Sequence, residues 1–104
     1  MADVPAPIRR MVDASNAGDT PAFLACFTPD AFLSDWGRDF TGRDGLADWN
    51  ATDNIGVNSH LEVVAAAPDG AAWQVTVAVS GGFDGEGTMT FTLAGDLISR
   101  LVIS

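Results

Sequence analysis

The chain lacks lysine and tyrosine, and it contains a single cysteine and a single histidine among its 104 residues. One cysteine cannot form an intramolecular disulfide, so a secreted scaffold stabilised by disulfides is excluded. No apolar run approaches the roughly 20 residues that cross a bilayer. The first residues show neither the basic nor the apolar segment of a signal peptide. We therefore expect a soluble, cytoplasmic protein.

Positive charge is also scarce. Five arginines stand against 14 acidic residues, which gives a formal net charge of −9. A surface of this charge repels phosphate backbones and anionic lipids, so we expect no nucleic-acid partner and no membrane partner. Apolar residues make up 47% of the chain and charged residues 18%, which is enough for a buried core. The length fits a single domain over residues 1–104.

The first half of the chain carries helical signals. Ile8, Met11 and Val12 form an i, i+3, i+4 apolar stripe, which predicts a helix that ends near Gly18. Thr20 is a typical N-cap residue, and a proline follows it. The pattern predicts a second helix over residues 20–27, a short strand over residues 31–36 and a third helix over residues 41–52.

From residue 56 onward the apolar period is two. Val75, Val77 and Val79 alternate with polar residues, and this alternation is typical of strands with one buried face. The last predicted strand, residues 97–103, is apolar on both faces, so we expect it at the centre of a sheet or at an interface. Turn signals at residues 68–70, 81–85 and 94–96 predict four strands in an antiparallel meander.

Four segments carry a family resemblance. They are Asn16-Ala17-Gly18-Asp19, Phe27-Thr28-Pro29-Asp30-Ala31, Ser34-Asp35 and Phe40-Thr41-Gly42-Arg43-Asp44-Gly45-Leu46. The chain resembles the ketosteroid isomerase / nuclear transport factor 2-like superfamily, which includes the SnoaL-like polyketide cyclases. The resemblance implies a cystatin-like α+β cone: three N-terminal helices packed in the concave face of a strongly curved antiparallel sheet, with a pocket at the open end. The periodicities agree with that fold.

Asp35 is the first candidate for a chemical role. The superfamily includes isomerases, dehydratases, cyclases, epoxide hydrolases and non-catalytic binders, so function must be argued from the site. Asp35 ends an apolar strand and precedes Trp36. Apolar surroundings disfavour a charged carboxylate, which suits a general base that takes a proton from carbon. By resemblance, Asp35 matches the catalytic aspartate of the isomerases and SnoaL-like cyclases. Alternatively, Asp35 caps a turn or pairs with Arg38 or Arg43 at the rim of the pocket.

Proton abstraction next to a carbonyl also needs a hydrogen-bond donor where negative charge develops. The resemblance implies a tyrosine on the first helix and a protonated aspartate on a strand, but the matching positions here are Met11 and Met89. Methionine cannot donate a hydrogen bond. Steroid isomerisation by that apparatus is therefore not expected, and both methionines are expected to fill space in an apolar cavity.

His60 is the second candidate. On a period of two it shares a strand face with Glu62 and Val64. If that face is concave, His60 can polarise a substrate or pair with Asp35, as histidines do in the dehydratases of the superfamily. If it is convex, His60 faces solvent or neighbouring surface residues.

Metal and relay sites have weaker support. One histidine with scattered aspartates shows no metal-ligand spacing, so we expect no metal and no cofactor. Arg43 and Asp48 invite comparison with the aspartate–arginine–aspartate relay of the epoxide hydrolases. However, Asp44 and Asp48 are four residues apart, which is typical of a solvated helix face. Arg43 is expected instead to tie the start of the third helix to the loop of Asp35.

The aromatic residues predict the lining of a pocket. Core packing explains any one of them, but together they suit a flat or alicyclic apolar ligand. The expected lining residues are Met11, Phe27, Phe32, Trp36, Trp49, Trp73, Met89 and Phe91.

The polar face of the predicted sheet carries small uncharged residues, among them Thr76, Thr88, Thr90 and Thr92. A strand face without lysine or glutamate favours contact with another sheet, and in the superfamily the convex face commonly dimerises. We therefore expect a homodimer. Two functions remain open: a cofactor-independent isomerase, dehydratase or cyclase with Asp35 as base, or a non-catalytic ligand-binding or dimerisation module.

Overall fold

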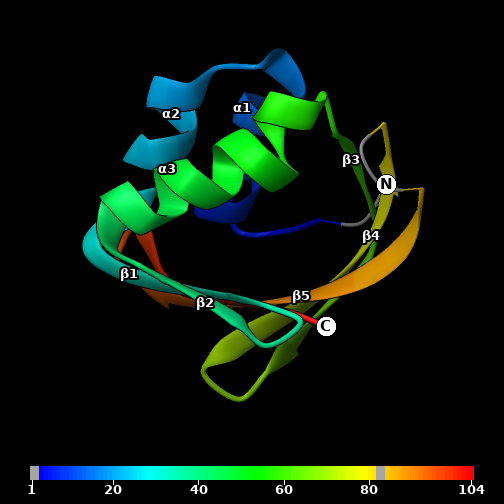
Figure 1. Ribbon diagram of the computed structural model, residues 1–104. Coiled ribbons are helices and arrows are strands. Elements are labelled where there is room, and N and C mark those ends of the chain that lie inside the picture. Colours follow the sequence, from blue (N-terminus) through cyan, green and yellow to red (C-terminus); the bar gives the residue numbers. More distant parts are fainter. Residues whose placement is uncertain (1–2, 82–83) are drawn as a thin grey trace.

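The computed structural model describes residues 3–81 and 84–104. In this part of the chain, three α-helices lie over one face of a six-stranded sheet (Figure 1). The elements are α1 (Ala6–Ala17), α2 (Thr20–Ala25), β1 (Phe27–Asp35), β2 (Arg38–Thr41), α3 (Gly42–Asp53), the 3₁₀ helix η1 (Ile55–Val57), β3 (His60–Asp69), β4 (Ala72–Ser80), β5 (Gly85–Ala94) and β6 (Leu97–Ile103).

The strands follow the order β2-β1-β6-β5-β4-β3. Strands β3 to β6 form the predicted antiparallel meander. Strand β6, which is apolar on both faces, lies inside the sheet between β1 and β5, as expected. However, β1 runs parallel to β6, so the expectation of a purely antiparallel sheet is wrong. The sheet also stays open, with β2 and β3 as its edges. It is therefore not the strongly curved, cone-shaped barrel that we expected.

The helical half differs from the prediction in its boundaries. The second helix was predicted over residues 20–27, but α2 stops at Ala25, and β1 begins at Phe27 and includes residues 28–30. The register between β1 and β6 shifts between Phe27 and Phe32. Pro29 lies within this irregular segment, where the backbone N–H that proline lacks is not needed for regular pairing. The short strand β2 was not predicted, since four residues are too few to show a period. The predicted turn at residues 81–85 includes 82–83, which lie outside the described residues.

Local signals account for the helix ends. Gly18 ends α1 in the left-handed region, with φ of 69°, where glycine carries no steric penalty. The N-cap of α2 is Asp19 and not Thr20, because the Asp19 carboxylate accepts a hydrogen bond from the backbone N–H of Ala22 at 3.1 Å. None of the helices in the described ranges is long and apolar enough to cross a membrane.

The core lies between the helices and the sheet. The largest of the fully buried side chains come from every layer: Ile8, Met11 and Val12 from α1, Phe23 from α2, Leu46 from α3, and Phe27, Leu33, Val75, Val77, Phe91, Ile98 and Leu101 from the strands. Burial of this apolar set supplies most of the stabilisation, at roughly 25 cal/mol for each Å² removed from water.

Two asparagines connect the elements around the end of α3. The side chain of Asn16, at the end of α1, donates to the carbonyl of Leu61 at 2.8 Å and accepts from the N–H of Leu61 at 2.7 Å. Asn54, the residue after α3, donates to Ser15 Oγ and to Asn50 Oδ1, both at 3.0 Å. These bonds fix α1 against both the edge strand β3 and the end of α3.

Candidate functional site

The candidate site begins at the turn between β1 and β2. Asp35 and Arg38 are paired across the hairpin, so only Trp36 and Gly37 form its loop. Both loop residues have positive φ, 50° and 87°, as a two-residue type I′ turn requires. This geometry places Arg38 beside Asp35, and its Nη2 donates to Asp35 Oδ2 at 2.8 Å.

Helix α3 completes a polar cluster around Asp35. Trp49 and Asp53 are four residues apart and therefore lie on the same helix face. Trp49 Nε1 donates to Asp35 Oδ2 at 3.0 Å, while Asp53 Oδ1 accepts from Arg38 Nη2 at 3.0 Å. The result is an aspartate–arginine–aspartate arrangement of Asp35, Arg38 and Asp53, in which a buried tryptophan orients Asp35.

The ion pair of Arg38 and Asp53 shifts both pKa values. Partial burial acts to raise the pKa of Asp53, but hydrogen bonds from Arg38 and Thr52 outweigh it and hold the pKa below its ordinary value. The hydrogen bond to Asp53 and its negative charge raise the pKa of Arg38, with a smaller contribution from Asp35. Since both shifts favour the charged forms, the pair is ionised at neutral pH.

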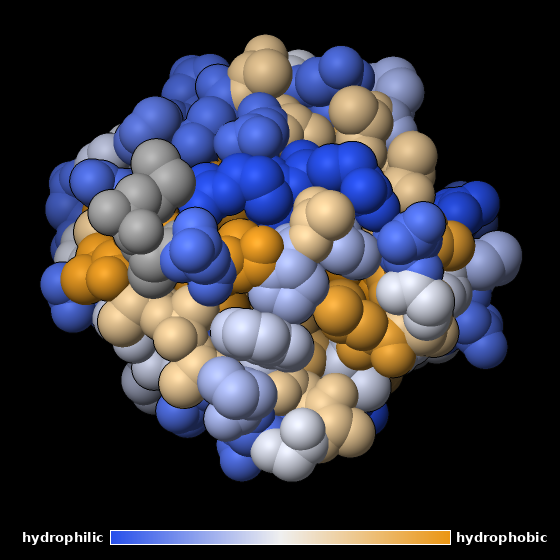
Figure 2. All heavy atoms as spheres, turned by 180° about the vertical axis from the view of Figure 1, so that it is seen from behind, coloured by the Kyte–Doolittle hydropathy of each residue, from blue (hydrophilic) through white to orange (hydrophobic). Residues whose placement is uncertain are grey.

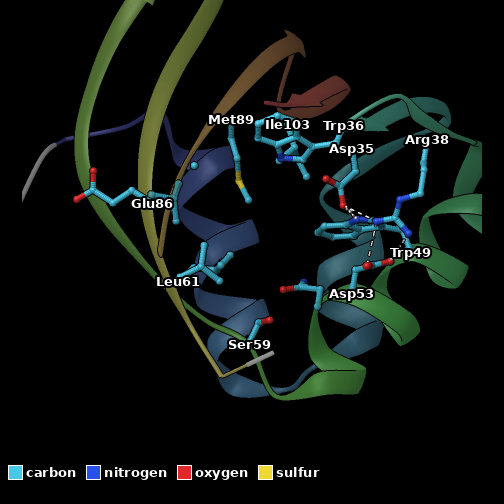
Figure 3. A pocket seen from close by; sticks show the side chains of 14 residues that line it. Asp35, Trp36, Arg38, Trp49, Asp53, Ser59, Leu61, Glu86, Met89 and Ile103 are labelled. Carbon is cyan, nitrogen blue, oxygen red and sulfur yellow. Dashed lines mark hydrogen bonds and ion pairs between the residues drawn. The ribbon is translucent and has the colours of Figure 1, made fainter. Parts of the chain in front are cut away.

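This cluster forms one wall of a cavity of about 280 Å³. Figure 3 shows Asp35, Trp49, Arg38 and Asp53 on the helix side, facing Leu61 and Met89 across the cavity. Glu86 also lines the cavity, but its carboxylate points away from the other labelled residues. The apolar wall consists of Leu61 of β3, Val77 and Val79 of β4, Met89 of β5 and Ile103 of β6.

The other end of the cavity is polar. Asn54 and Ser59 line it, and Figure 3 shows Ser59 at the end opposite Trp36 and Ile103. The η1 segment connects the two residues, and the backbone N–H of Ser59 donates to the carbonyl of Asn54 at 3.1 Å. Asn54 is 1% and Ser59 6% exposed. The cavity therefore has an acidic wall, an apolar wall and a neutral polar end.

Four of the predicted site residues meet at this cavity: Asp35, Trp36, Trp49 and Met89. Trp49 is 4% exposed and is stacked on Phe23, with ring centroids 6.1 Å apart. Trp36 has the opposite environment, because 78% of it is exposed at the β1–β2 turn. The cavity therefore has one fixed aromatic side chain inside it and one on its rim.

The other predicted lining residues lie elsewhere, and this part of the expectation is corrected. Met11, Phe27 and Phe91 are completely buried in the core, where the apolar face of each element packs against the next. Trp73 is partly buried against that core. Phe32 lies on the opposite face of β1 from the buried Leu33, and the guanidinium of Arg100 covers its ring at 4.7 Å.

His60 does not reach the cavity. Its strand alternates between the buried residues Leu61 and Val63 and the exposed residues His60 and Glu62. The face that carries His60 is therefore the outer face. Of the two alternatives given for His60, the one in which it faces solvent is correct. Arg43 does not tie α3 to Asp35 either, because its Nη2 donates to the carbonyl of Phe27 at 2.7 Å.

Sequence reasoning missed the roles of Asp53, Asn54 and Ser59, and it treated Arg38 only as a possible rim partner of Asp35. A signal for Asp53 was present, since it follows Trp49 by one helical turn. No local pattern distinguishes Asn54 or Ser59 from ordinary residues at a helix end. Across residues 3–81 and 84–104, no group of three histidine, cysteine, aspartate or glutamate side chains is arranged to hold a metal ion.

The fold belongs to the NTF2-like class. An NTF2-like protein of Cytophaga hutchinsonii, 12% identical, superposes with a TM-score of 0.80 over 94% of this chain and 85% of its own. Within that class, the chain belongs to the SnoaL-like domain family, whose pattern matches residues 8–101. The resemblance seen in the sequence is thereby confirmed.

Two further structures are similar along nearly the whole chain. A protein of Sinorhizobium meliloti, provisionally named a polyketide cyclase, has a TM-score of 0.90 and 28% identity, over 98% of this chain and 96% of that one. A protein of Kribbella flavida, provisionally named a ketosteroid isomerase, has a TM-score of 0.80 and 22% identity, over 94% and 73%. No curated protein matches the chain.

Proposed function

We propose that the cavity binds a small apolar molecule and that Asp35 acts there as a general base, in a reaction of the isomerase, dehydratase or cyclase type. One observation carries the proposal. Trp49 and Arg38 both donate to Oδ2 of Asp35, which leaves Oδ1 without a partner among the described residues. A carboxylate that is oriented through one oxygen and lines a largely apolar cavity can accept a proton with the other.

The proposed reaction begins with transfer of a proton to Asp35 Oδ1. Oδ1 takes a proton from a carbon of the substrate, and the electron pair of the broken C–H bond stays on the substrate. Return of the proton to another carbon gives isomerisation. In dehydration a β-hydroxyl group takes the proton from Asp35 and leaves as water, and in cyclisation the carbanion attacks a second carbonyl of the same molecule, whose oxygen takes the proton. Each step is balanced without an external oxidant or cofactor.

The neighbouring donors also limit the substrate. A carboxylate is a modest base towards carbon acids, and Arg38 and Trp49 already donate to one oxygen of Asp35. The tyrosine donor of the steroid isomerases is replaced by Met11, which lies in the core. A substrate with an unusually acidic C–H bond, such as one next to a carbonyl and an aromatic ring or between two carbonyls, fits these constraints. The provisional name of the 28% identical S. meliloti protein is consistent with this class.

An alternative is a binding module without catalysis. The observation that favours it is the ion pair itself: Arg38 is about half exposed, with 54% of its side chain accessible, and bridges Asp35 to Asp53 at the rim. In this alternative, Asp35 holds the β1–β2 hairpin against α3, and the cavity only stores or carries its ligand.

Hydrogen–deuterium exchange at carbon separates the two functions. 2-Tetralone has acidic C–H bonds between a ketone and an aromatic ring, and loss of its C1 proton signal in D₂O can be followed by NMR. We expect the protein to accelerate this exchange, and Asp35→Asn to slow it by on the order of 10²- to 10⁴-fold. The matched control is Asp48→Asn, which removes the same charge from an exposed position on α3.

The two outcomes are distinct. Exchange that is fast in the wild type and in Asp48→Asn but slow in a folded Asp35→Asn variant supports the general base. If 2-tetralone binds and yet exchanges no faster than in buffer, Asp35 is not a base for such carbon acids and the binding module is favoured. Circular dichroism and urea unfolding establish that both variants are folded.

We further propose that the outer face of the sheet forms a homodimer. Thr76, Thr88, Thr90 and Thr92 are half buried on the face opposite the core residues Val75 and Met89. In Figure 2, strongly hydrophilic residues gather over the upper part of the molecule, on the side of the helices. The middle of the lower part shows mostly weakly polar and apolar residues, with strongly hydrophilic ones at its margins. The outer face also carries Glu62 of β3 and Arg100 of β6, but its threonines are uncharged. In a chain of net charge −9, a second copy meets less repulsion where these threonines lie.

A further inference from the structure

The polar end of the cavity contains two hydrogen-bonding atoms that the folded chain does not use. The side-chain amide of Asn54 donates both of its hydrogens, to Ser15 and Asn50. In the described part of the chain, no donor reaches Asn54 Oδ1 and no group is paired with Ser59 Oγ. Both residues are more than nine-tenths buried and both line the cavity.

Such atoms are uncommon in folded proteins. The large majority of buried polar side-chain atoms have a hydrogen-bond partner, and an exception requires an explanation. Among the side-chain nitrogen and oxygen atoms of the described ranges that are fully enclosed by protein, Thr28 Oγ1 is the one that has no hydrogen-bond partner. Asn54 Oδ1 and Ser59 Oγ differ from it because neither atom is fully enclosed and their residues line the cavity. Their partner therefore has to enter the cavity.

The position of the two atoms is fixed by the backbone. The carbonyl of Asn54 accepts hydrogen bonds from the N–H groups of Val57 and Ser59, both at 3.1 Å. Gly56 lies so close to the carbonyl of Ala51 that no Cβ could be accommodated there. Because the segment is packed against the end of α3 and closed by its own hydrogen bonds, the two polar groups are presented to a ligand without rearrangement.

We infer that Asn54 and Ser59 bind the hydroxyl group of the ligand, so that the cavity takes an alicyclic or aromatic alcohol. A hydroxyl donates one hydrogen bond and accepts others. It donates to the carbonyl oxygen of Asn54 and accepts from the hydroxyl of Ser59, which satisfies both atoms at once. A ketone oxygen would leave Asn54 Oδ1 without a donor, and a carboxylate would be repelled by Asp35 and Asp53.

This inference rests on the proposed ligand cavity and names the class of molecule that enters it. The inference assigns a second group of ligand-binding residues to the site, in addition to Asp35. Asp35 acts at the acidic wall, while Asn54 and Ser59 hold the hydroxyl at the polar end of the cavity. Figure 3 shows Ser59 beyond Asp53 as seen from Asp35. The ligand is thereby aligned along the apolar wall, with a defined carbon next to Asp35.

The test compares two probes that differ in one group. 2-Naphthol carries a hydroxyl where 2-methylnaphthalene carries a methyl group of similar size, and equilibrium dialysis with absorbance detection gives both affinities. We expect the wild type to bind 2-naphthol at least about tenfold more tightly, the effect of one or two net hydrogen bonds. In Ser59→Ala we expect that preference to fall by about tenfold, with the affinity for 2-methylnaphthalene unchanged.

Ser59→Ala is preferred to a change of Asn54 because Asn54 also joins α1 to α3. The matched control is Ser80→Ala, at an exposed position of β4 away from the cavity, and we expect it to keep the preference. Equal affinity for the two probes in the wild type would overturn the inference. It would also be overturned if Ser59→Ala kept the preference for 2-naphthol. Loss of the preference in Asp35→Asn would then identify Asp35 as the group that holds the hydroxyl. Failure of both probes to bind would remove the apolar cavity of the proposed function as well.

Discussion

At the scale of single residues, Asp53 couples the site to pH. Its pKa in the folded protein is below the ordinary value because Arg38 and Thr52 donate hydrogen bonds to its carboxylate. A lowered folded pKa contributes stability above the unfolded pKa of about 3.9, and this contribution is lost as the pH falls through the folded pKa. Asp53 therefore stabilises the protein at neutral pH and not in acid.

We predict that Asp53→Asn lowers the free energy of unfolding by at most about 1 kcal/mol at pH 7, since the pair is partly exposed. Urea unfolding at pH 7, 5, 4 and 3 should show the difference from the wild type shrinking below about pH 4. Asp48→Asn is the control and should show little difference at any pH. A difference for Asp53→Asn that stays constant down to pH 3 would contradict the assigned role of ionisation.

The residues of the site differ in how far the sequence could predict them. Asp35 was found because a carboxylate at the end of an apolar strand is conspicuous. Its contacts with Arg38 and Trp49 depend on a two-residue turn and on the packing of α3, and neither can be seen in a local pattern. The turn was hidden because its first residue is Trp36, whereas asparagine and glycine are the usual residues at positive φ. Met11, Phe27 and Phe91 were placed in the lining because apolar composition does not distinguish a core from a cavity.

At the scale of elements, the periodicities predicted the meander of β3 to β6 and the three helices, since each of these shows its own repeat. They could not predict that β1 runs parallel to β6, because alternation specifies a buried face but not the neighbouring strand. The four-residue β2 and the 28–30 segment of β1, with its proline, were missed for the lack of a period. These are also the elements that carry Asp35 and Arg38.

Among the contacts between elements, we predict that the attachment of α1 to β3 contributes most to the stability of the cavity wall. Asn16→Ala removes both hydrogen bonds to the backbone of Leu61, a residue of the lining. Because Asn16 is exposed and water can replace part of the loss, we expect the free energy of unfolding to fall by about 1–2 kcal/mol, measured by urea unfolding. Asn16→Asp keeps the acceptor but turns a negatively charged oxygen towards the carbonyl of Leu61, so its loss should be at least as large. Equal stability of all three proteins would show that the contact is not maintained in solution.

At the scale of the whole molecule, the distribution of charge separates two surfaces. The aspartates lie on the helices, in the loops and on the strands β1 to β3, and none lies on β4, β5 or β6. The central strands β4 and β5 carry threonines on their outer face. Thr90 lies on β5, opposite Gln74 of β4 and Val102 of β6. If two sheets pack on this face, each Thr90 is enclosed by the interface, where a charged side chain without a partner is costly.

We predict that the wild type sediments with twice the chain mass of 10.8 kDa at micromolar concentration, and that Thr90→Glu sediments as a monomer, by analytical ultracentrifugation. Ala22→Glu adds the same charge to the exposed first turn of α2 and should remain a dimer, which separates the effect of position from that of net charge.

A monomeric wild type would exclude the sheet-to-sheet dimer. A dimer that survives Thr90→Glu would place the interface on another surface, and the uncharged threonines of the outer face would then need a different explanation. Because the cavity lies on the helix side of the sheet, Thr90→Glu should leave the affinity for 2-naphthol unchanged in either case.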